Sequence, residues 1–143
     1  MSQTVEQALR QAKLVIDPRD YALLKLPARA IMAAAGVLAE ISEPFCTLIV
    51  DQHEVTLIIP AEAVPDFAVR LRDHAVAQST YRLITLDVEL EPELVGFMAR
   101  ISAALASAGV SILPLAAYSR DHLLVPSEQV DIAHQALVKL QSS

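Results

Sequence analysis

Residues 58–64 read IIPAEAV, and residues 124–130 read LVPSEQV. The two segments share Pro, Glu and Val at matching positions, and each lies between a strand-like apolar run and a helix-like one. Self-similarity of this kind indicates an internal duplication. The sequence therefore predicts two related halves, which we expect to span residues 1–77, including a leading helix, and residues 78–143.

A β-hairpin is predicted before each of these two segments. In both halves a short polar turn separates two apolar runs, which is the pattern of a hairpin; the runs are 45–50 and 55–59 in the first half, and 112–118 and 122–125 in the second. Residues 81–90 alternate between apolar and polar side chains, as expected of a half-buried strand. We expect residues 21–26 to be the matching strand of the first half and residues 14–17 to form an additional one.

Helical periodicity connects these strands. Pro92 suits a first helical position, apolar residues then recur at helical spacing as far as Ala108, and Gly109 can supply a left-handed cap. A final helix follows Pro126. In the first half we expect helices over residues 28–40 and 61–73, preceded by the leading helix at 4–12.

The resulting element order is β-α-β-β-α in each half. Strands with one polar face and helices with one apolar stripe bury themselves as two layers, with helices on one face of an antiparallel sheet. We therefore predict an α+β fold of two ferredoxin-like repeats. A unit of this size buries only about 60% of its extended surface, so we also expect the halves to pair and the chain to form a homodimer.

Charge and hydropathy exclude several partners. The net charge of −6 opposes binding to a phosphate backbone, and the chain has no Trp for base stacking. The longest uncharged apolar run, residues 30–39, is about half of the ~20 residues that a membrane-spanning helix needs. The N-terminus lacks a basic segment followed by an apolar one. We expect no nucleic-acid or membrane binding and a cytoplasmic location.

Catalytic and metal-binding motifs are missing from the sequence. Cys46 is the single cysteine, the four histidines are scattered, and no nucleophile elbow or glycine-rich phosphate loop is present. We therefore expect no metal, no cofactor and no enzymatic activity. Acid–base partners meet in space rather than in sequence, so a small enzyme using dispersed Glu and His residues stays an alternative.

Three segments of the second half carry a family resemblance: LVGFM at 94–98, LASAGVSI at 105–112 and YSRDHLLV at 118–125. By their order and spacing, the second half resembles an ACT domain. The whole chain is similar to small tandem-ACT proteins related to the amino-acid-sensing CASTOR family, because residues 21–27 and 54–64 resemble the degenerate first repeat of those proteins.

The resemblance implies a small ligand, usually an amino acid, held between two ACT units. The corresponding positions here are Glu91, Leu94, Val95, Gly96, Ser111, Ile112 and Leu113. A helix N-terminus offers free amides to a ligand carboxylate. An acidic side chain such as Asp121 can accept a hydrogen bond from the ligand's amino group.

Each of these residues also has a purely structural interpretation. Gly96 can serve helix packing, Asp121 can cap a turn, and Glu91 can simply favour a helix start. Our leading hypothesis is a non-enzymatic regulatory protein whose amino-acid ligand shifts an equilibrium that an unidentified protein partner reads. The alternative is a protein-interaction or dimerisation module without a small ligand.

Overall fold

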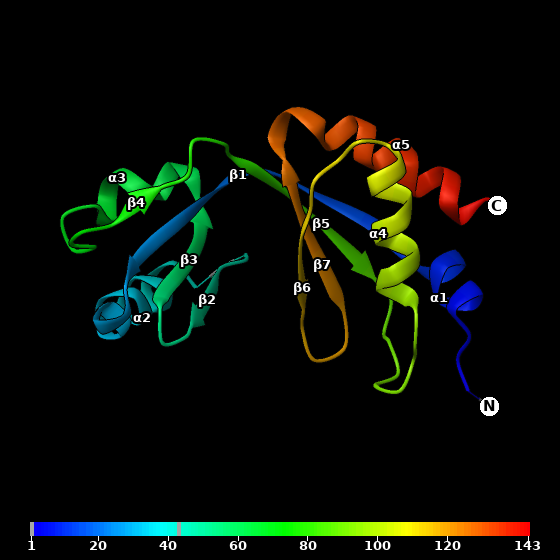
Figure 1. The fold of residues 1–143 in the computed structure, drawn as a ribbon, viewed down its shortest axis with the longest axis horizontal. Coiled ribbons are helices and arrows are strands. Elements are labelled where there is room, and N and C mark those ends of the chain that lie inside the picture. Colours follow the sequence, from blue (N-terminus) through cyan, green and yellow to red (C-terminus); the bar gives the residue numbers. More distant parts are fainter. Residues whose placement is uncertain (1, 43) are drawn as a thin grey trace. The chain divides into compact units, whose positions relative to one another are not determined.

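The computed structural model describes residues 2–42 and 44–143, and the chain forms two compact units, both drawn in Figure 1. The continuous unit comprises Arg19–Tyr81. The split unit combines the N-terminal segment up to Pro18 with Arg82–Ser143. The leading helix, which we expected with the first half, thus belongs to the split unit, and the compact units divide the chain differently from the boundaries 1–77 and 78–143.

The split unit contains three helices and the strands that they cover. Its order in the sheet is β1-β5-β7-β6, and β6 and β7 pair antiparallel. The elements are α1 (Val5–Gln11), the first part of β1 (Lys13–Pro27), β5 (Tyr81–Asp87), α4 (Phe97–Ser107), β6 (Leu113–Ala116), β7 (Asp121–Pro126), the 3₁₀ turn η3 (Ser127–Gln129) and α5 (Val130–Gln141).

The continuous unit contains the rest of β1 and follows the order β2-β3-β1-β4, with each neighbouring pair antiparallel. Its other elements are η1 (Ala28–Ala30), α2 (Ile31–Ile41), β2 (Thr47–Val50), β3 (Glu54–Pro60), η2 (Ala61–Ala63), α3 (Val64–Phe67) and β4 (Ala75–Val76). Two expectations were wrong here. The strands expected at 14–17 and 21–26 form the single strand β1, and the helix expected at 61–73 is reduced to α3.

The predicted fold class is confirmed. In both units the second hairpin strand lies beside the first strand, giving β2-β3-β1 and β6-β7-β5, and a further strand flanks the first one. That further strand is β4 in the continuous unit and the first part of β1 in the split unit. The N-terminal segment therefore fills the fourth strand position of the split unit, and an α+β, ferredoxin-like arrangement results.

The junctions at the shared Pro-Glu-Val pattern are alike, as the sequence predicts. Strand β3 ends at Pro60 and β7 at Pro126, with φ values of −54° and −51°. A 3₁₀ turn follows each proline, and the helices begin at Val64 and Val130. Proline favours this geometry because its ring fixes φ near −65° and its missing N–H is not needed at the start of a helix.

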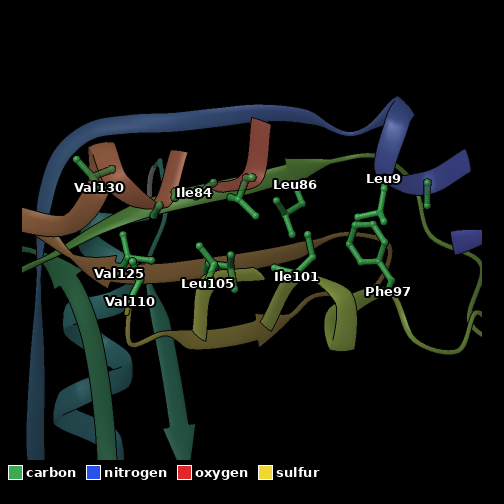
Figure 2. Close-up of a cluster of buried hydrophobic side chains, with 13 residues drawn as sticks. Leu9, Ile84, Leu86, Phe97, Ile101, Leu105, Val110, Val125 and Val130 are labelled. Atoms are coloured by element: carbon green, nitrogen blue, oxygen red, sulfur yellow. The ribbon is translucent and has the colours of Figure 1, made fainter. Parts of the chain in front are cut away.

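The core of the split unit holds its helices against one face of the strands (Figure 2). Ile84 and Leu86 of β5 contribute to this cluster, as expected from the alternating pattern of residues 81–90. Figure 2 shows Leu9 of α1 beside Phe97 of α4. Full burial of such side chains stabilises a fold by about 1.5–3 kcal/mol each, which explains why α1 joins this unit.

The continuous unit has its own apolar cluster, which includes Leu24, Leu57 and Val37. Helix α2 forms despite Gly36, whose missing side chain leaves room for the guanidinium group of Arg70. Within the described ranges 2–42 and 44–143, no helix is both long enough and apolar enough to cross a membrane.

Candidate ligand-binding site

The connection between β5 and α4 differs from the expected one. We expected the helix to begin at Pro92, but α4 begins at Phe97 and residues 88–96 form a loop. Gly96 precedes the helix with φ +98° and ψ +2°, a left-handed conformation that favours glycine. Pro92 instead follows Glu91 in a tight turn, in which the amide of Leu94 donates to the carbonyl of Glu91 at 3.0 Å.

A cavity of about 390 Å³ opens beside this helix start. The loop, the first turn of α4 and the tip of the β6–β7 hairpin line it. The lining residues are Leu90, Glu91, Pro92, Leu94, Gly96, Phe97, Met98, Ala99, Ala117, Tyr118, Ser119, Arg120 and Asp121. Its volume lies within the range of about 300–1,000 Å³ that is usual for small-molecule sites.

The structure brings together three residues that the resemblance assigns to a ligand, Glu91, Leu94 and Gly96, and it adds Asp121, the candidate acceptor for an amino group. Val95 is 85% exposed and does not line the cavity. Ser111, Ile112 and Leu113 lie outside it too. Leu113 begins β6 opposite Leu124, whereas the cavity is at the other end of that hairpin.

The first turn of α4 presents free hydrogen-bond donors to the cavity. The first backbone bond of the helix runs from Arg100 to the carbonyl of Gly96, at 3.1 Å. The amides of Phe97, Met98 and Ala99 come before it, and Gly96 has no side chain to cap them. Among the described residues, none of these three amides donates to a backbone carbonyl outside the helix, and no side chain caps the helix start. The positive end of the helix dipole therefore adjoins the cavity.

Asp121 places a half-buried carboxylate on the same cavity. Within the described ranges its carboxylate accepts no hydrogen bond from the hairpin turn, unlike a turn-capping aspartate. Desolvation raises the pKa of Asp121, and the neighbouring His122 partly opposes this shift. A buried carboxylate of this kind is stabilised in its charged form when a cation approaches.

Glu91 is already engaged by a residue that sequence reasoning missed, Gln3. The backbone amide of Gln3 donates to both carboxylate oxygens of Glu91 at 3.1 Å. The side-chain oxygen of Gln3 accepts from the Glu91 amide at 3.0 Å, and its Nε2 donates to the Glu89 carbonyl at 2.9 Å. No local signal could have indicated this pairing, because the partners are 88 residues apart.

The other charged groups near the cavity also have partners. Arg120 Nε donates to Asp87 Oδ1 at 2.8 Å, and its NH1 group donates to Ser119 Oγ at 3.1 Å. His122 Nδ1 lies 2.9 Å from Thr85 Oγ1, and desolvation lowers the pKa of His122. Within the described ranges, no three His, Cys, Asp or Glu residues are placed to hold a metal ion.

Comparisons with known proteins agree with this geometry. Residues 76–139 match the model of the ACT domain family. No curated protein sequence matches the chain.

Several solved structures share the fold. A Vibrio cholerae protein of unknown function, a possible transport protein, is 25% identical with a TM-score of 0.74, and the match covers 96% of each chain. An Agrobacterium tumefaciens protein is 18% identical with a TM-score of 0.72, over 91% of this chain and 89% of that one. The regulatory subunit of aspartate kinase from Thermus flavus is 14% identical with a TM-score of 0.69, over 89% and 95%.

The last two likenesses establish the fold alone, and the closer relation to CASTOR proteins stays a prediction, as does the duplication. The fold matches that of aspartate kinase regulatory ACT domains. The matched residues include β5, the loop with Gly96, α4 and the β6–β7 hairpin. Residues 76–139 are thus similar to the ACT domain family, and the residues that line the cavity at the start of α4 lie within this matched range.

Proposed function

We propose that this chain is a non-catalytic regulatory protein that binds a free amino acid in the cavity at the start of α4. One observation carries the proposal: free backbone amides and an unpaired carboxylate line the same cavity of about 390 Å³. These two features are complementary to the two ends of an α-amino acid. The likeness to regulatory subunits of aspartate kinase supports the regulatory part of the proposal.

In this proposal the ligand carboxylate binds at the amides of Phe97, Met98 and Ala99. A helix N-terminus suits an anion because its amides are unpaired and the dipole favours negative charge. The ligand ammonium group binds Asp121 through a charge-assisted hydrogen bond. Glu91 plays a different part from the one the resemblance implies, since Gln3 already occupies its carboxylate.

We further propose that a second ACT unit, from another copy of the chain, covers the cavity. Two exposed apolar side chains support this. Val95 is 85% exposed beside Gly96, and Tyr118 on the cavity wall is fully exposed. Tyrosine is enriched at protein interfaces, because its ring is apolar and its hydroxyl can still reach water. Amino-acid binding would then shift the dimer equilibrium, which a protein partner in the cytoplasm reads.

Thermal unfolding against each of the twenty common amino acids tests this function. An amino acid at one hundred times its dissociation constant should stabilise the chain by about 2.7 kcal/mol. Asp121→Asn should reduce that stabilisation, whereas Glu128→Gln, which removes the same charge from an exposed side chain outside the cavity, should not. The proposal fails if no amino acid at millimolar concentration stabilises the chain.

A second candidate is a protein-interaction module that needs no small ligand. A groove of about 510 Å³ lies between α4 and α5, and most of its lining is apolar or small, including Ala104, Ile132, Ala136 and Leu140. Ile132 is 48% exposed there. Self-association of the chain that is independent of every amino acid and is lost in Ile132→Lys would favour this function over ligand sensing.

A further inference from the structure

The loop that lines the ligand cavity has few attachments of its own. Between β5 and α4, the amide of Leu90 donates to the Ser119 carbonyl at 2.8 Å, and Leu94 closes the turn at Glu91. The bonds at Glu89 and Glu91 come from Gln3. Apolar contacts of Val88, Leu90 and Leu94 with the core supplement these bonds, but a loop with so few hydrogen bonds of its own opens locally unless further groups hold it.

Helix α1 fixes Gln3 in place. Thr4 caps this helix, with Gln7 N donating to Thr4 Oγ1 at 3.1 Å and Thr4 N donating to Gln7 Oε1 at 2.9 Å. This reciprocal arrangement is a capping box. Ala8 and Leu9 anchor the helix in the core of the split unit. Gln3 therefore reaches the loop from a rigid support.

Two further contacts join the same segment to the start of α4. The Arg100 NH1 group donates to Glu6 Oε2 at 3.1 Å. A Cβ atom placed on Gly96 would lie 3.9 Å from Val5 Cγ2, so Val5 stands directly over the helix start. The N-terminal residues thus contact both the loop and the helix turn that carries the free amides.

We propose that Gln3 is a positioning residue of the ligand cavity, acting through Glu91 on the loop that ends at Gly96. The part of this inference that concerns ligand affinity rests on the proposed function. Because both events order the same loop, docking of residues 2–7 and ligand binding strengthen each other, by reciprocal coupling. The segment continues through α1 into β1, so a ligand-dependent change in it reaches a strand shared by both units.

Hydrogen exchange in the ligand-free chain tests the positioning role without any ligand. Gln3→Ala removes the two side-chain bonds to the loop and should speed exchange at the Glu91 and Leu94 amides by about tenfold. Gln11→Ala is the matched control, because Gln11 is an exposed glutamine at the end of α1 and has no hydrogen bond to the loop. Equal exchange in the two variants would overturn the proposal.

A pH profile separates positioning from a general loss of stability. Gln3→Glu replaces the Nε2 donor to the Glu89 carbonyl with a carboxylate oxygen, which repels that carbonyl when ionised, so the loop should exchange faster than in the parent chain near neutral pH. Protonation below about pH 4 should remove the repulsion and restore slow exchange. A pH-independent effect would show that Gln3 supports folding only. The pH profile of Gln3→Glu therefore tests the positioning role even if Gln3→Ala fails to fold.

A ligand-binding experiment on the parent chain and Gln3→Ala uses the amino acid that most stabilises the parent chain. Its affinity should fall by about tenfold in Gln3→Ala, and its binding should slow exchange in residues 4–7 of the parent chain. If no amino acid binds the parent chain, the proposed function fails while the exchange experiments still decide the role of Gln3. Unchanged affinity in Gln3→Ala would overturn the coupling.

Discussion

The connection from β1 to α2 in the continuous unit differs from the matching connection, from β5 to α4, in the split unit. In the continuous unit β1 ends at Pro27, a 3₁₀ turn follows at once, and α2 begins at Ile31. In the split unit residues 88–96 separate β5 from α4. The cavity lies beside this longer connection, and the first residues of α4 line it. The two units share a fold, and the candidate ligand site of the split unit depends on two local features, the loop of residues 88–96 and the left-handed conformation of Gly96.

The two hairpin turns differ in a similar way. Asp51 accepts hydrogen bonds from the amides of His53 at 2.7 Å and Glu54 at 2.9 Å, and these bonds lower its pKa. Asp121 has no such bonds, and desolvation raises its pKa. The same residue type thus serves the turn in one unit, whereas in the other it leaves an acceptor free for a ligand.

Substitution of one glycine in each unit, Gly96 and Gly36, should give the largest contrast. Gly96→Val forces a β-branched residue to positive φ and should lower the free energy of unfolding by about 2 kcal/mol, while displacing the first turn of α4 and abolishing amino-acid binding. Gly36→Ala lies in the middle of α2 and should raise stability by at most about 1 kcal/mol, if the Arg70 guanidinium 3.3 Å away moves aside. Urea unfolding measures the free energy of unfolding of both variants. A Gly96→Val chain as stable as the parent chain would contradict the role given to this helix start.

Replacement of the two aspartates should give the next largest contrast. Asp121→Asn removes the charged acceptor and should weaken amino-acid binding by about tenfold. Asp51→Asn should leave that affinity unchanged, because Asp51 belongs to the turn of the other unit. Titration calorimetry measures the affinities, and equal losses in the two variants would place the ligand elsewhere.

The fold could be predicted because its determinants are local. Alternation in residues 81–90 and the Pro-Glu-Val pattern each reflect a conformational preference that a short segment carries by itself. The cavity depends on distant contacts instead. Gln3 bonds Glu91 across 88 residues of sequence, and Leu9 of α1, which follows Gln3, is buried in the core of the split unit. The sequence indicated Gly96 and Asp121 as ligand residues, but not that Glu91 is already engaged.

The missed boundaries have similar causes. Pro92 favours both a first helical position and a turn, and its neighbours do not decide between them. Helix α3 ends at Phe67, and tighter bonds to the third preceding residue follow it, from Arg70 to the Phe67 carbonyl at 3.0 Å and from Leu71 to the Ala68 carbonyl at 3.3 Å, while Leu71 enters the core. In both places the chain forms a short turn, which apolar periodicity does not distinguish from a helix.

The smallest contrast concerns the pH dependence of stability in the two aspartate variants. A lowered pKa stabilises the native chain above the ordinary value of 3.8 and loses that effect as pH falls through the folded-state pKa. Asp51→Asn should therefore destabilise the chain at pH 7 and matter little at pH 2. A raised pKa acts in the opposite sense: its contribution is full below 3.8 and is lost as pH rises through the folded-state pKa.

Asp121→Asn should accordingly stabilise the ligand-free chain slightly at pH 7, because it removes a partly desolvated charge. Urea unfolding of the parent chain and both variants at a series of pH values measures the two effects. Addition of a bound amino acid should cancel the gain in Asp121→Asn, since its ammonium group compensates the carboxylate only in the parent chain. If Asp121→Asn instead destabilises the chain at every pH, Asp121 serves the fold and the ammonium acceptor must be another group.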